Sequence, residues 1–239
     1  MGKNRKTVFK GFDYMHCDDF ARYLEEMAAK GWHFKEWGVG LKFEKGEPEQ
    51  AVYAVEVFEK ASDSEGYLYT APSLHWTKDA NNKGSISIYK LSATTGEILW
   101  EAPYNAHTVS GVSGGIQSSP LLGKPGTNLE GMIFYAIART KTSGSGTLVA
   151  LDTATGQEVW RLDMDYYAWS SPVGVYDAQG NGYVVLCDSH GTAHFIDGAT
   201  GSVEDTLYLG GLVEASPAVY NNMIVVGTRL KKICGIRIR

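Results

Sequence analysis

Residues 150–160 read ALDTATGQEVW, and residues 90–100 read KLSATTGEILW. A third, weaker copy stands at residues 195–205, FIDGATGSVED. In each copy an apolar segment runs into a short turn with a Thr-Gly pair, which is typical of two β-strands joined by a tight turn. A chain that contains the same turn three times is built from a repeated β unit.

The spacing of the copies gives the size of that unit. Three turn glycines recur at intervals of 60 and 45 residues: Gly96, Gly156 and Gly201. A Ser-Pro pair recurs in step with them, at residues 119–120, 171–172 and 216–217. A period of about 45 residues is that of a four-stranded propeller blade. The chain holds 28 glycines, which agrees with a fold rich in tight turns.

Each position of the repeated turn has a mechanical role. Asp152 and its counterpart Asp197 can accept hydrogen bonds from backbone N–H groups of the turn. Gly156, like Gly96 and Gly201, suits a backbone conformation with positive φ that a Cβ would resist. We therefore expect these residues to fix the register of two antiparallel strands.

A tryptophan follows two of the turns, Trp100 and Trp160, each four residues after its glycine. We expect each indole to lie on an outer strand and to wedge between neighbouring sheets. Two copies depart from the pattern, because Ser92 replaces the turn aspartate in the first and Asp205 replaces the tryptophan in the third.

These features together resemble the PQQ-like (quinoprotein-type) β-propeller repeat family, over residues 66–239. The resemblance implies a mainly β fold, a partial propeller of four-stranded antiparallel sheets with about three and a half blades. We place the blades at residues 66–102, 116–163, 168–208 and 212–239. An open arc exposes strand edges at its ends, so we expect self-association, a partner chain or further blades to cover them.

Residues 1–62 follow a different pattern and predict a small α+β domain that precedes the propeller. Apolar residues recur at helical spacing at Phe20, Leu24 and Met27, and Gly31 suits the left-handed position that ends a helix. One short strand is expected before the helix in the sequence, at residues 7–14, and three after it, at residues 33–38, 40–47 and 50–59.

The same N-terminal part resembles a small bacterial domain of unknown function. The resemblance rests on the segments EMAAKGW at residues 26–32 and FEKGEP at residues 43–48. No activity comes with it, so the role of this domain is left open.

Composition excludes several classes of partner. With a net charge of −5, the chain lacks the broad basic field of a nucleic-acid-binding protein. No apolar stretch is long enough to span a membrane, and the N-terminal MGKNRKT lacks the apolar core of a signal peptide. The sequence as written predicts a cytoplasmic protein, whereas propellers of the resembled family often act outside the cytoplasm.

The sequence gives little support for a metal site or for a catalytic nucleophile. The segment DAQGNG at residues 177–182 begins like a calcium loop but lacks a second carboxylate and the closing Glu, so we interpret it as a hairpin turn. His190 and His194 cannot share a metal on an extended strand, where four residues span roughly 13 Å. Ser170 and Ser171 lack a nucleophile motif. We expect no cofactor and no metal.

One segment is a candidate binding surface. Tyr166, Tyr167 and Trp169 lie within DMDYYAW, residues 163–169. Aromatic rings beside carboxylates are typical of surfaces that bind a protein or a carbohydrate. Packing between blades is the alternative interpretation of the same residues.

The sequence favours a non-enzymatic binding or scaffolding protein that presents propeller loops to a protein or carbohydrate partner. A fragment of a quinoprotein-type dehydrogenase is the first alternative. The resemblance argues against it, since those enzymes stack their cofactor against adjacent cysteines and the three cysteines here are far apart: Cys17, Cys187 and Cys234. A regulatory sensor, with the N-terminal domain as its active part, is the second alternative.

Overall fold

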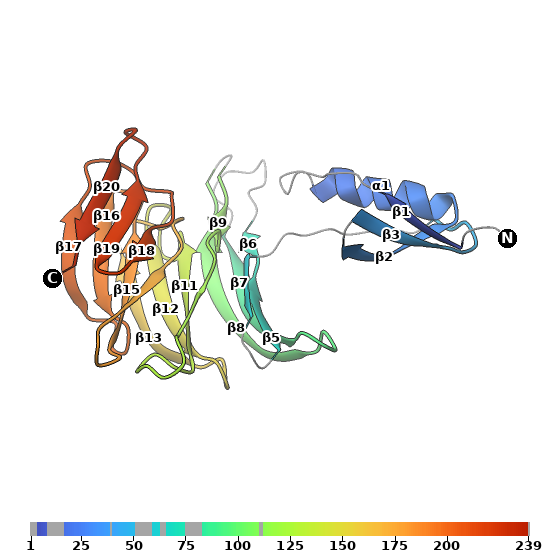
Figure 1. Ribbon diagram of the computed structural model, residues 1–239. Helices are drawn as coiled ribbons and strands as arrows, with labels where there is room; N and C mark the ends of the chain where they lie inside the picture. Colours follow the sequence, from blue (N-terminus) through green and yellow to red (C-terminus); the bar gives the residue numbers. More distant parts are fainter. Residues whose placement is uncertain are drawn as a thin grey trace. The chain divides into compact units, whose positions relative to one another are not determined.

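The computed structural model describes residues 4–8, 17–38, 40–50, 59–62, 66–74, 83–109 and 112–238. The chain forms two compact units, Met1–Val57 and Phe58–Arg239. Figure 1 shows a helix in the first unit and a series of β-sheets in the second. Each unit is described by itself.

The first unit packs helix α1 (Cys17–Ala29) against a three-stranded antiparallel sheet. The strands follow the order β1-β3-β2, with bounds Arg5–Val8, Gly40–Lys45 and Trp32–Gly38. The apolar stripe of the helix buries its side chains against the sheet, and the core consists of Phe20, Leu24, Met27, Leu41 and Phe43. Most of the strand expected at residues 50–59 lies outside the described residues.

Gly31 ends the helix in the way that its position in the sequence predicts. Its φ is +72°, and its N–H donates a hydrogen bond to the carbonyl oxygen of Ala28 at 2.9 Å. A Cβ at this position would lie 2.6 Å from the carbonyl oxygen of Gly46. Only glycine meets both the conformation and the close approach.

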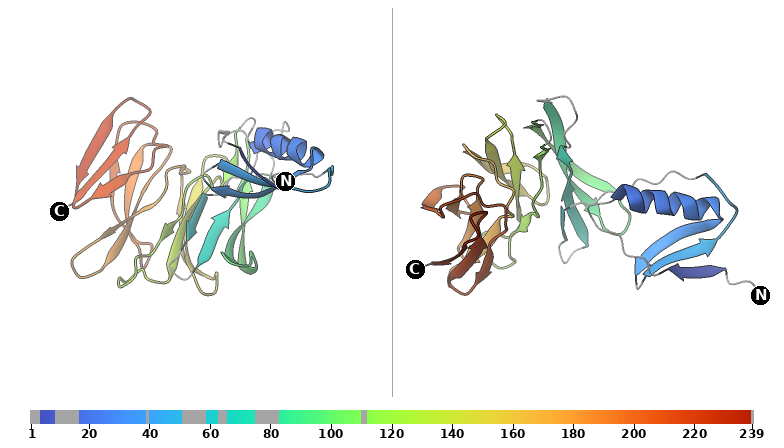
Figure 2. Two further views of the ribbon diagram at one scale, coloured as in Figure 1. Left: turned by 45° about the vertical axis from the view of Figure 1, so that its right-hand side comes forward. Right: turned by 90° about the horizontal axis from the view of Figure 1, so that it is seen from above.

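The second unit is mainly β and consists of antiparallel sheets that follow one another along the chain (Figure 2). The first sheet has the order β4-β5-β7-β8. Its strands span Glu59–Ser62, Tyr67–Ala71, Lys83–Ser92 and Ile98–His107. It is the first blade of a propeller arc.

The first blade begins with strand β4, before residue 66, where the sequence analysis placed the start of this blade. Strand β4 pairs with β5 from Glu59↔Ala71 to Ser62↔Leu68, so residues 59–62 belong to the second unit. The sequence hid this strand because EKAS has neither alternating apolar residues nor aromatic residues.

The second blade is centred on β11, whose bounds are Met132–Ala138. The sheet has the order β13-β12-β11-β9-β6, and β10 also pairs with β11. The bounds of these further strands are Ser73–Leu74 for β6, Gly114–Gly115 for β9, Leu121–Leu122 for β10, Gly146–Asp152 for β12 and Glu158–Met164 for β13. All residues of β11 are buried, because neighbouring blades cover both faces of this sheet.

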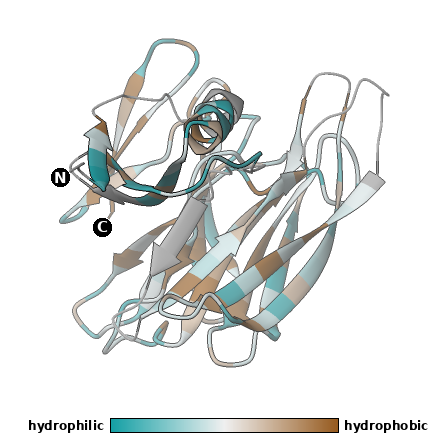
Figure 3. Ribbon diagram, turned by 90° about the vertical axis from the view of Figure 1, so that its right-hand side faces the viewer, coloured by the Kyte–Doolittle hydropathy of each residue, from teal (hydrophilic) through white to brown (hydrophobic). Residues whose placement is uncertain are grey.

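The third blade has four strands in chain order, β14 to β17, and the fourth has three, β18 to β20. The bounds in the third blade are Val173–Tyr176, Gly182–Cys187, Thr192–Asp197 and Val203–Tyr208. Those in the fourth are Ala218–Tyr220, Met223–Gly227 and Ile233–Arg237. Apolar residues recur along the strands of this unit (Figure 3).

Indole rings join consecutive blades at the outer rim. The ring of Trp100 covers Gly156, where an added Cβ would lie 2.6 Å from its Cδ2, and its Nε1–H donates to the carbonyl oxygen of Thr153 at 3.0 Å. Trp160 covers Gly201 in the same way, and its Nε1–H donates to the carbonyl oxygen of Gly198 at 2.9 Å. Each tryptophan thus docks on the repeated turn of the following blade.

The repeated turns are closed by their acidic residues. Oδ1 of Asp152 accepts hydrogen bonds from two backbone N–H groups, at 3.0 and 2.7 Å, and from the hydroxyl of Thr155 at 2.8 Å. Asp197 makes the same three contacts in the third blade. In the first blade the Ser92 hydroxyl accepts one N–H at 3.2 Å. At Gly96, with φ +73°, no described atom beyond its chain neighbours lies within 4 Å of an added Cβ.

The Ser-Pro pairs join the blades a second time, away from the turns. The backbone N–H of Ser119 donates to Oγ of Ser171 at 3.0 Å, and the N–H of Ser171 donates to Oγ of Ser216 at 3.0 Å. The Ser-Pro pair recurs once per blade, and its serines therefore form a series of hydrogen bonds that links three blades.

Candidate binding surface

Three neighbouring rings form an exposed ridge where the loops of the second and third blades meet. Tyr166 stacks on His190 with a centroid distance of 4.5 Å and an interplanar angle of 14°. His190 in turn faces Tyr208 at 5.3 Å. Tyr166 is 44% exposed and Tyr208 is 60% exposed. We call Tyr166, His190 and Tyr208 the aromatic ridge.

Three different segments supply the ridge. Tyr166 follows β13, His190 lies in the turn between β15 and β16, and Tyr208 ends β17. Residues of the turn are held in place by Asp188, so the ring of His190 projects from a fixed backbone. The ridge therefore offers a preformed apolar surface with polar atoms at its edges.

A buried arginine packs against the other two aromatic residues of the predicted surface. The guanidinium carbon of Arg139 lies 4.2 Å from the ring centroid of Tyr167 and 5.9 Å from that of Trp169. The two rings are 5.1 Å apart. The predicted group thus divides: Tyr166 belongs to the exposed ridge, while Tyr167 and Trp169 pack on a cation.

Arg139 is fixed by its backbone as well as by its side chain. It has a positive φ of 63°, is 6% exposed, and its Nε–H donates to the carbonyl oxygen of Ser113 at 3.3 Å. Its own carbonyl oxygen accepts the N–H of His107 at 2.8 Å. The indole Nε1–H of Trp169 is buried and has no hydrogen-bond partner among the described residues, which leaves a donor for a ligand or water.

Asp188 organises the turn that carries His190. Its Oδ1 accepts the N–H groups of His190, Gly191 and Thr192, each at 2.9 Å, and its Oδ2 pairs with Nε2 of His194 at 2.8 Å. Burial would raise the pKa of this carboxyl, but the hydrogen bonds from His194 and the backbone hold it below its usual value. The carboxylate is therefore charged, and its two oxygens are occupied by the turn and by His194 of β16.

The other chemical candidates have structural partners. Asp177 uses both carboxylate oxygens within its turn, accepting from Gln179 and Asn181 at 2.7 to 2.9 Å. Oγ of Ser170 donates to the carbonyl oxygen of Cys187 at 2.8 Å and is buried. Within the described ranges, no group of three or more His, Cys, Asp or Glu side chains is placed to hold a metal ion.

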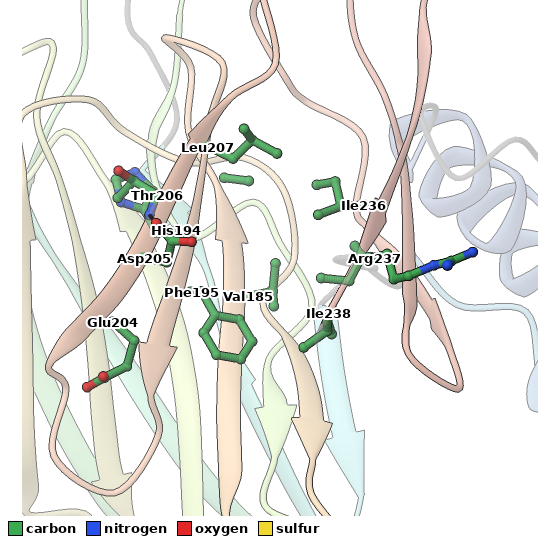
Figure 4. Close-up of a pocket in the computed structure, with 12 residues that line it drawn as sticks. Val185, His194, Phe195, Glu204, Asp205, Thr206, Leu207, Ile236, Arg237 and Ile238 are labelled. Carbon is green, nitrogen blue, oxygen red and sulfur yellow. Dashed lines mark hydrogen bonds between the residues drawn. The ribbon is translucent and has the colours of Figure 1, made fainter.

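A groove of about 530 Å³ separates the third blade from the fourth (Figure 4). One wall carries Phe195 of β16 and Leu207 of β17, and the other carries Ile236 and Ile238, at and after β20. Carboxylates line the rim on the β17 side: Glu204 and Asp205. The groove lies where Asp205 stands in place of the docking tryptophan.

Sequence reasoning did not identify Arg139, His190 and Tyr208 as neighbours of the predicted aromatic residues. These residues lie in different blades or strands, and only strand pairing brings them to one end of the sheets. The sequence does place His190 in the turn between two predicted strands of the blade that also contains Tyr208. The proximity of these two residues could have been inferred from that placement.

Two overlapping stretches, residues 82–173 and 144–239, match the family model described as "Outer membrane protein assembly factor BamB". Together they cover more than half of the chain. The chain belongs to this family. The family's repeats are of the PQQ-like type, in agreement with the docked tryptophans and the repeated turns.

A curated relative and two solved structures are similar to the chain. The "Outer membrane protein assembly factor BamB" of Kangiella koreensis is 27% identical over 177 residues, which cover 61% of this chain and 44% of that relative. This chain therefore spans less than half of the length of that relative.

The similar solved structures support the fold alone. BamB from Moraxella catarrhalis has a TM-score of 0.50 at 15% identity, with 80% of this chain and 54% of that chain covered. The computationally designed Ika4 protein has a TM-score of 0.52 at 14% identity, with 77% and 92% covered.

Residues 17–99 match a second model, described as "Protein of unknown function (DUF2812)". The match includes helix α1 and strands β2 and β3 of the first unit, and it extends into the first blade. Within the described part of the chain, no helix is long and apolar enough to cross a bilayer.

Proposed function

We propose that the protein is a non-enzymatic scaffold that binds a protein partner through the aromatic ridge. The carrying observation is that Tyr166 stacks on His190, that Tyr208 contacts His190 at a tilted angle, and that all three side chains are exposed rather than buried in a core. Large rings with polar edges are enriched in the centres of protein interfaces, and rigid loops on a β scaffold are a common place for them.

The family supports a role in assembly. Its description and the name of the curated relative both refer to assembly of outer membrane proteins. A location outside the cytoplasm, as those names suggest, differs from the cytoplasmic location expected from the N-terminal sequence. The partner and the compartment are both part of the proposal.

Site-specific photo-crosslinking tests the proposal. A photoreactive phenylalanine analogue replaces Tyr166 or Tyr208 in separate chains, and Tyr220, which is 80% exposed on the fourth blade, is the matched control. Each chain is produced in bacteria both with and without an export signal. We expect a discrete protein adduct from both ridge positions in one compartment and none from the control.

Two results would contradict a protein partner. Absence of any ridge adduct in both compartments is the first. The second is binding of the purified chain to a glycan array that is lost in Tyr166→Ala, which would support a carbohydrate partner. Loss of the adduct in His190→Ala would show that the whole ridge takes part.

A further inference from the structure

The sheet of the first unit has two different faces. Helix α1 covers one of them (Figure 1), and Leu41 and Phe43 of β3 belong to the core on that side. Because successive side chains of a strand point to opposite faces, Lys42 and Glu44 of the same strand lie on the other face. Lys42 is exposed there and Glu44 is partly exposed. We call the face that carries Lys42 and Glu44 the polar face.

Strand pairing brings cations from three strands onto the polar face. Arg5 and Thr7 of β1 pair with Glu44 and Lys42 of β3, so their side chains share this face. Lys35 of β2 reaches it as well, since its Nζ lies 3.2 Å from Oε2 of Glu44. Each strand of the sheet thus contributes a cation to one surface.

A hollow of about 340 Å³ lies among these side chains. The charged residues that line it are Arg5, Lys6, Lys35, Lys42 and Glu44, so cations outnumber carboxylates by four to one. All four cations are exposed. The hollow is therefore positively charged, although the chain as a whole has a net charge of −5.

The guanidinium of Arg5 is the donor that a ligand would meet first. It is exposed and forms no ion pair with a described residue, whereas the carboxylate of its cross-strand neighbour Glu44 is paired with Lys35. A guanidinium carries five N–H donors in a planar fork that matches the two oxygens of a carboxylate. The hydroxyl of Thr7, which also lines the hollow, is a further donor.

The distribution of the cations favours an acidic protein segment as the ligand. Neighbouring strands lie about 5 Å apart, so cations on three strands form a row that is too wide for one phosphate group to contact in full. A nucleic acid would extend beyond the hollow and meet the rest of a chain with a net charge of −5. A short acidic segment matches the width of the row without extending past it.

We propose that the polar face of the first unit binds an acidic segment of a partner protein. One carboxylate of the segment pairs with the free guanidinium of Arg5, and others pair with the lysines of the neighbouring strands. The polar face belongs to residues 1–57 and the aromatic ridge to residues 58–239, so the two surfaces are tested separately. The proposal gives the first unit a binding role of its own.

Peptide binding to the full chain tests the proposal. The probe is a fluorescein-labelled peptide of about eight residues in which Glu alternates with Ser, and the matched control has Lys in place of every Glu. We expect the Glu peptide to bind at least about tenfold more tightly by fluorescence anisotropy. Its affinity should fall several-fold when the salt concentration rises from about 50 mM to about 150 mM, because salt screens exposed charges.

Charge reversal locates the site. A chain with both Arg5→Glu and Lys35→Glu should bind the Glu peptide at least about tenfold more weakly and should gain affinity for the Lys peptide. A gain of binding cannot result from unfolding, so it separates the site from a loss of structure. The matched control carries Lys30→Glu and Lys232→Glu, at exposed lysines outside the hollow, and should keep its affinity for the Glu peptide within about twofold.

Four results would overturn the proposal. Two concern the peptides: equal affinity for both, or no binding of the Glu peptide at millimolar concentration. The third is an equal loss of affinity in the charge reversal and in its matched control. The fourth is a concentration-dependent dimer of the unmodified chain that the charge reversal dissociates, because it would assign the polar face to a second copy.

Discussion

A single indole ring joins each of the first two blades to the blade that follows. Trp160 is 9% exposed, covers Gly201 and donates its Nε1–H to a backbone carbonyl, so ring, glycine and acceptor form one interaction. Trp100 repeats the arrangement on Gly156. The glycines are required for two reasons, since each has a positive φ and each lies under a ring.

Trp160→Ala should lower the free energy of unfolding by about 3–5 kcal/mol, because it removes a buried ring and leaves the carbonyl of Gly198 without its donor. Urea denaturation followed by circular dichroism measures the change. Tyr220→Ala, at an 80% exposed side chain, should change stability by no more than about 0.5 kcal/mol. Equal effects of the two substitutions would mean that the indole does not connect the blades.

The buried carboxylate of Asp188 should make stability depend on acid pH. Hydrogen bonds hold its folded pKa below the usual value, and those from Thr155 do the same for Asp152. The unfolded chain then binds protons first, so stability is complete above about pH 5 and falls as the pH drops through the folded pKa values. Thermal midpoints measured from pH 7 to pH 2 should show a shallower fall in Asp188→Asn than in the unmodified chain. A parallel pair of curves would contradict this role.

The residues of the aromatic surface illustrate what sequence can and cannot give. The cluster Tyr166, Tyr167 and Trp169 can be recognised in the sequence, because the three residues lie within four positions of one another. Its division into a ridge and a cation-binding pair cannot be recognised there. That division depends on His190 and Arg139, which only the folded strands bring close to the cluster. Long-range neighbours of this kind leave no periodic signal in one sequence.

Among the secondary-structure elements, the Ser-Pro pairs connect neighbouring blades through hydrogen bonds. Oγ of Ser171 accepts the N–H of Ser119, and Oγ of Ser216 accepts that of Ser171. Ser171→Ala removes an acceptor while nearly preserving volume. It should lower the free energy of unfolding by about 1 kcal/mol, as measured by urea denaturation. Ser189→Ala, in a turn of the same blade, is the control, and a larger loss there would contradict the assignment.

The strands differ in how readily the sequence reveals them. Strands β12 and β16 end in the repeated turn and are predictable from it, because a turn fixes the strands on both sides. Strand β4 carries no such mark, and its pairing with β5 became evident only in the structure. Polar edge strands are hidden for a physical reason, since an edge exposed to water needs no alternating apolar residues.

For the whole molecule, the two units have separate cores. The core around Phe43 lies within residues 1–57, and the cores between blades lie within residues 58–239. We propose that the two units fold independently. A chain limited to residues 58–239 should then keep the near-ultraviolet circular dichroism and the urea midpoint of the propeller transition. Loss of cooperative unfolding in that chain would contradict independence.

The repeat, more than any single residue, made the fold predictable from sequence. Two markers in phase identified a four-stranded unit, and the family match over residues 82–239 agrees with it. Function is less accessible, because the aromatic ridge is assembled from loops and strand ends that lie apart in the sequence. The ridge does not repeat from blade to blade, so it does not stand out in the sequence.

Nuclear Overhauser contacts of the tryptophan rings test the stacked-blade account most directly. In a chain labelled selectively at Trp and Gly, the account predicts cross-peaks between the ring of Trp160 and the Hα protons of Gly201, and between Trp100 and Gly156. It also predicts slow solvent exchange of both indole N–H protons, since each is bound to a backbone carbonyl. Rapidly exchanging indoles without these cross-peaks would contradict it.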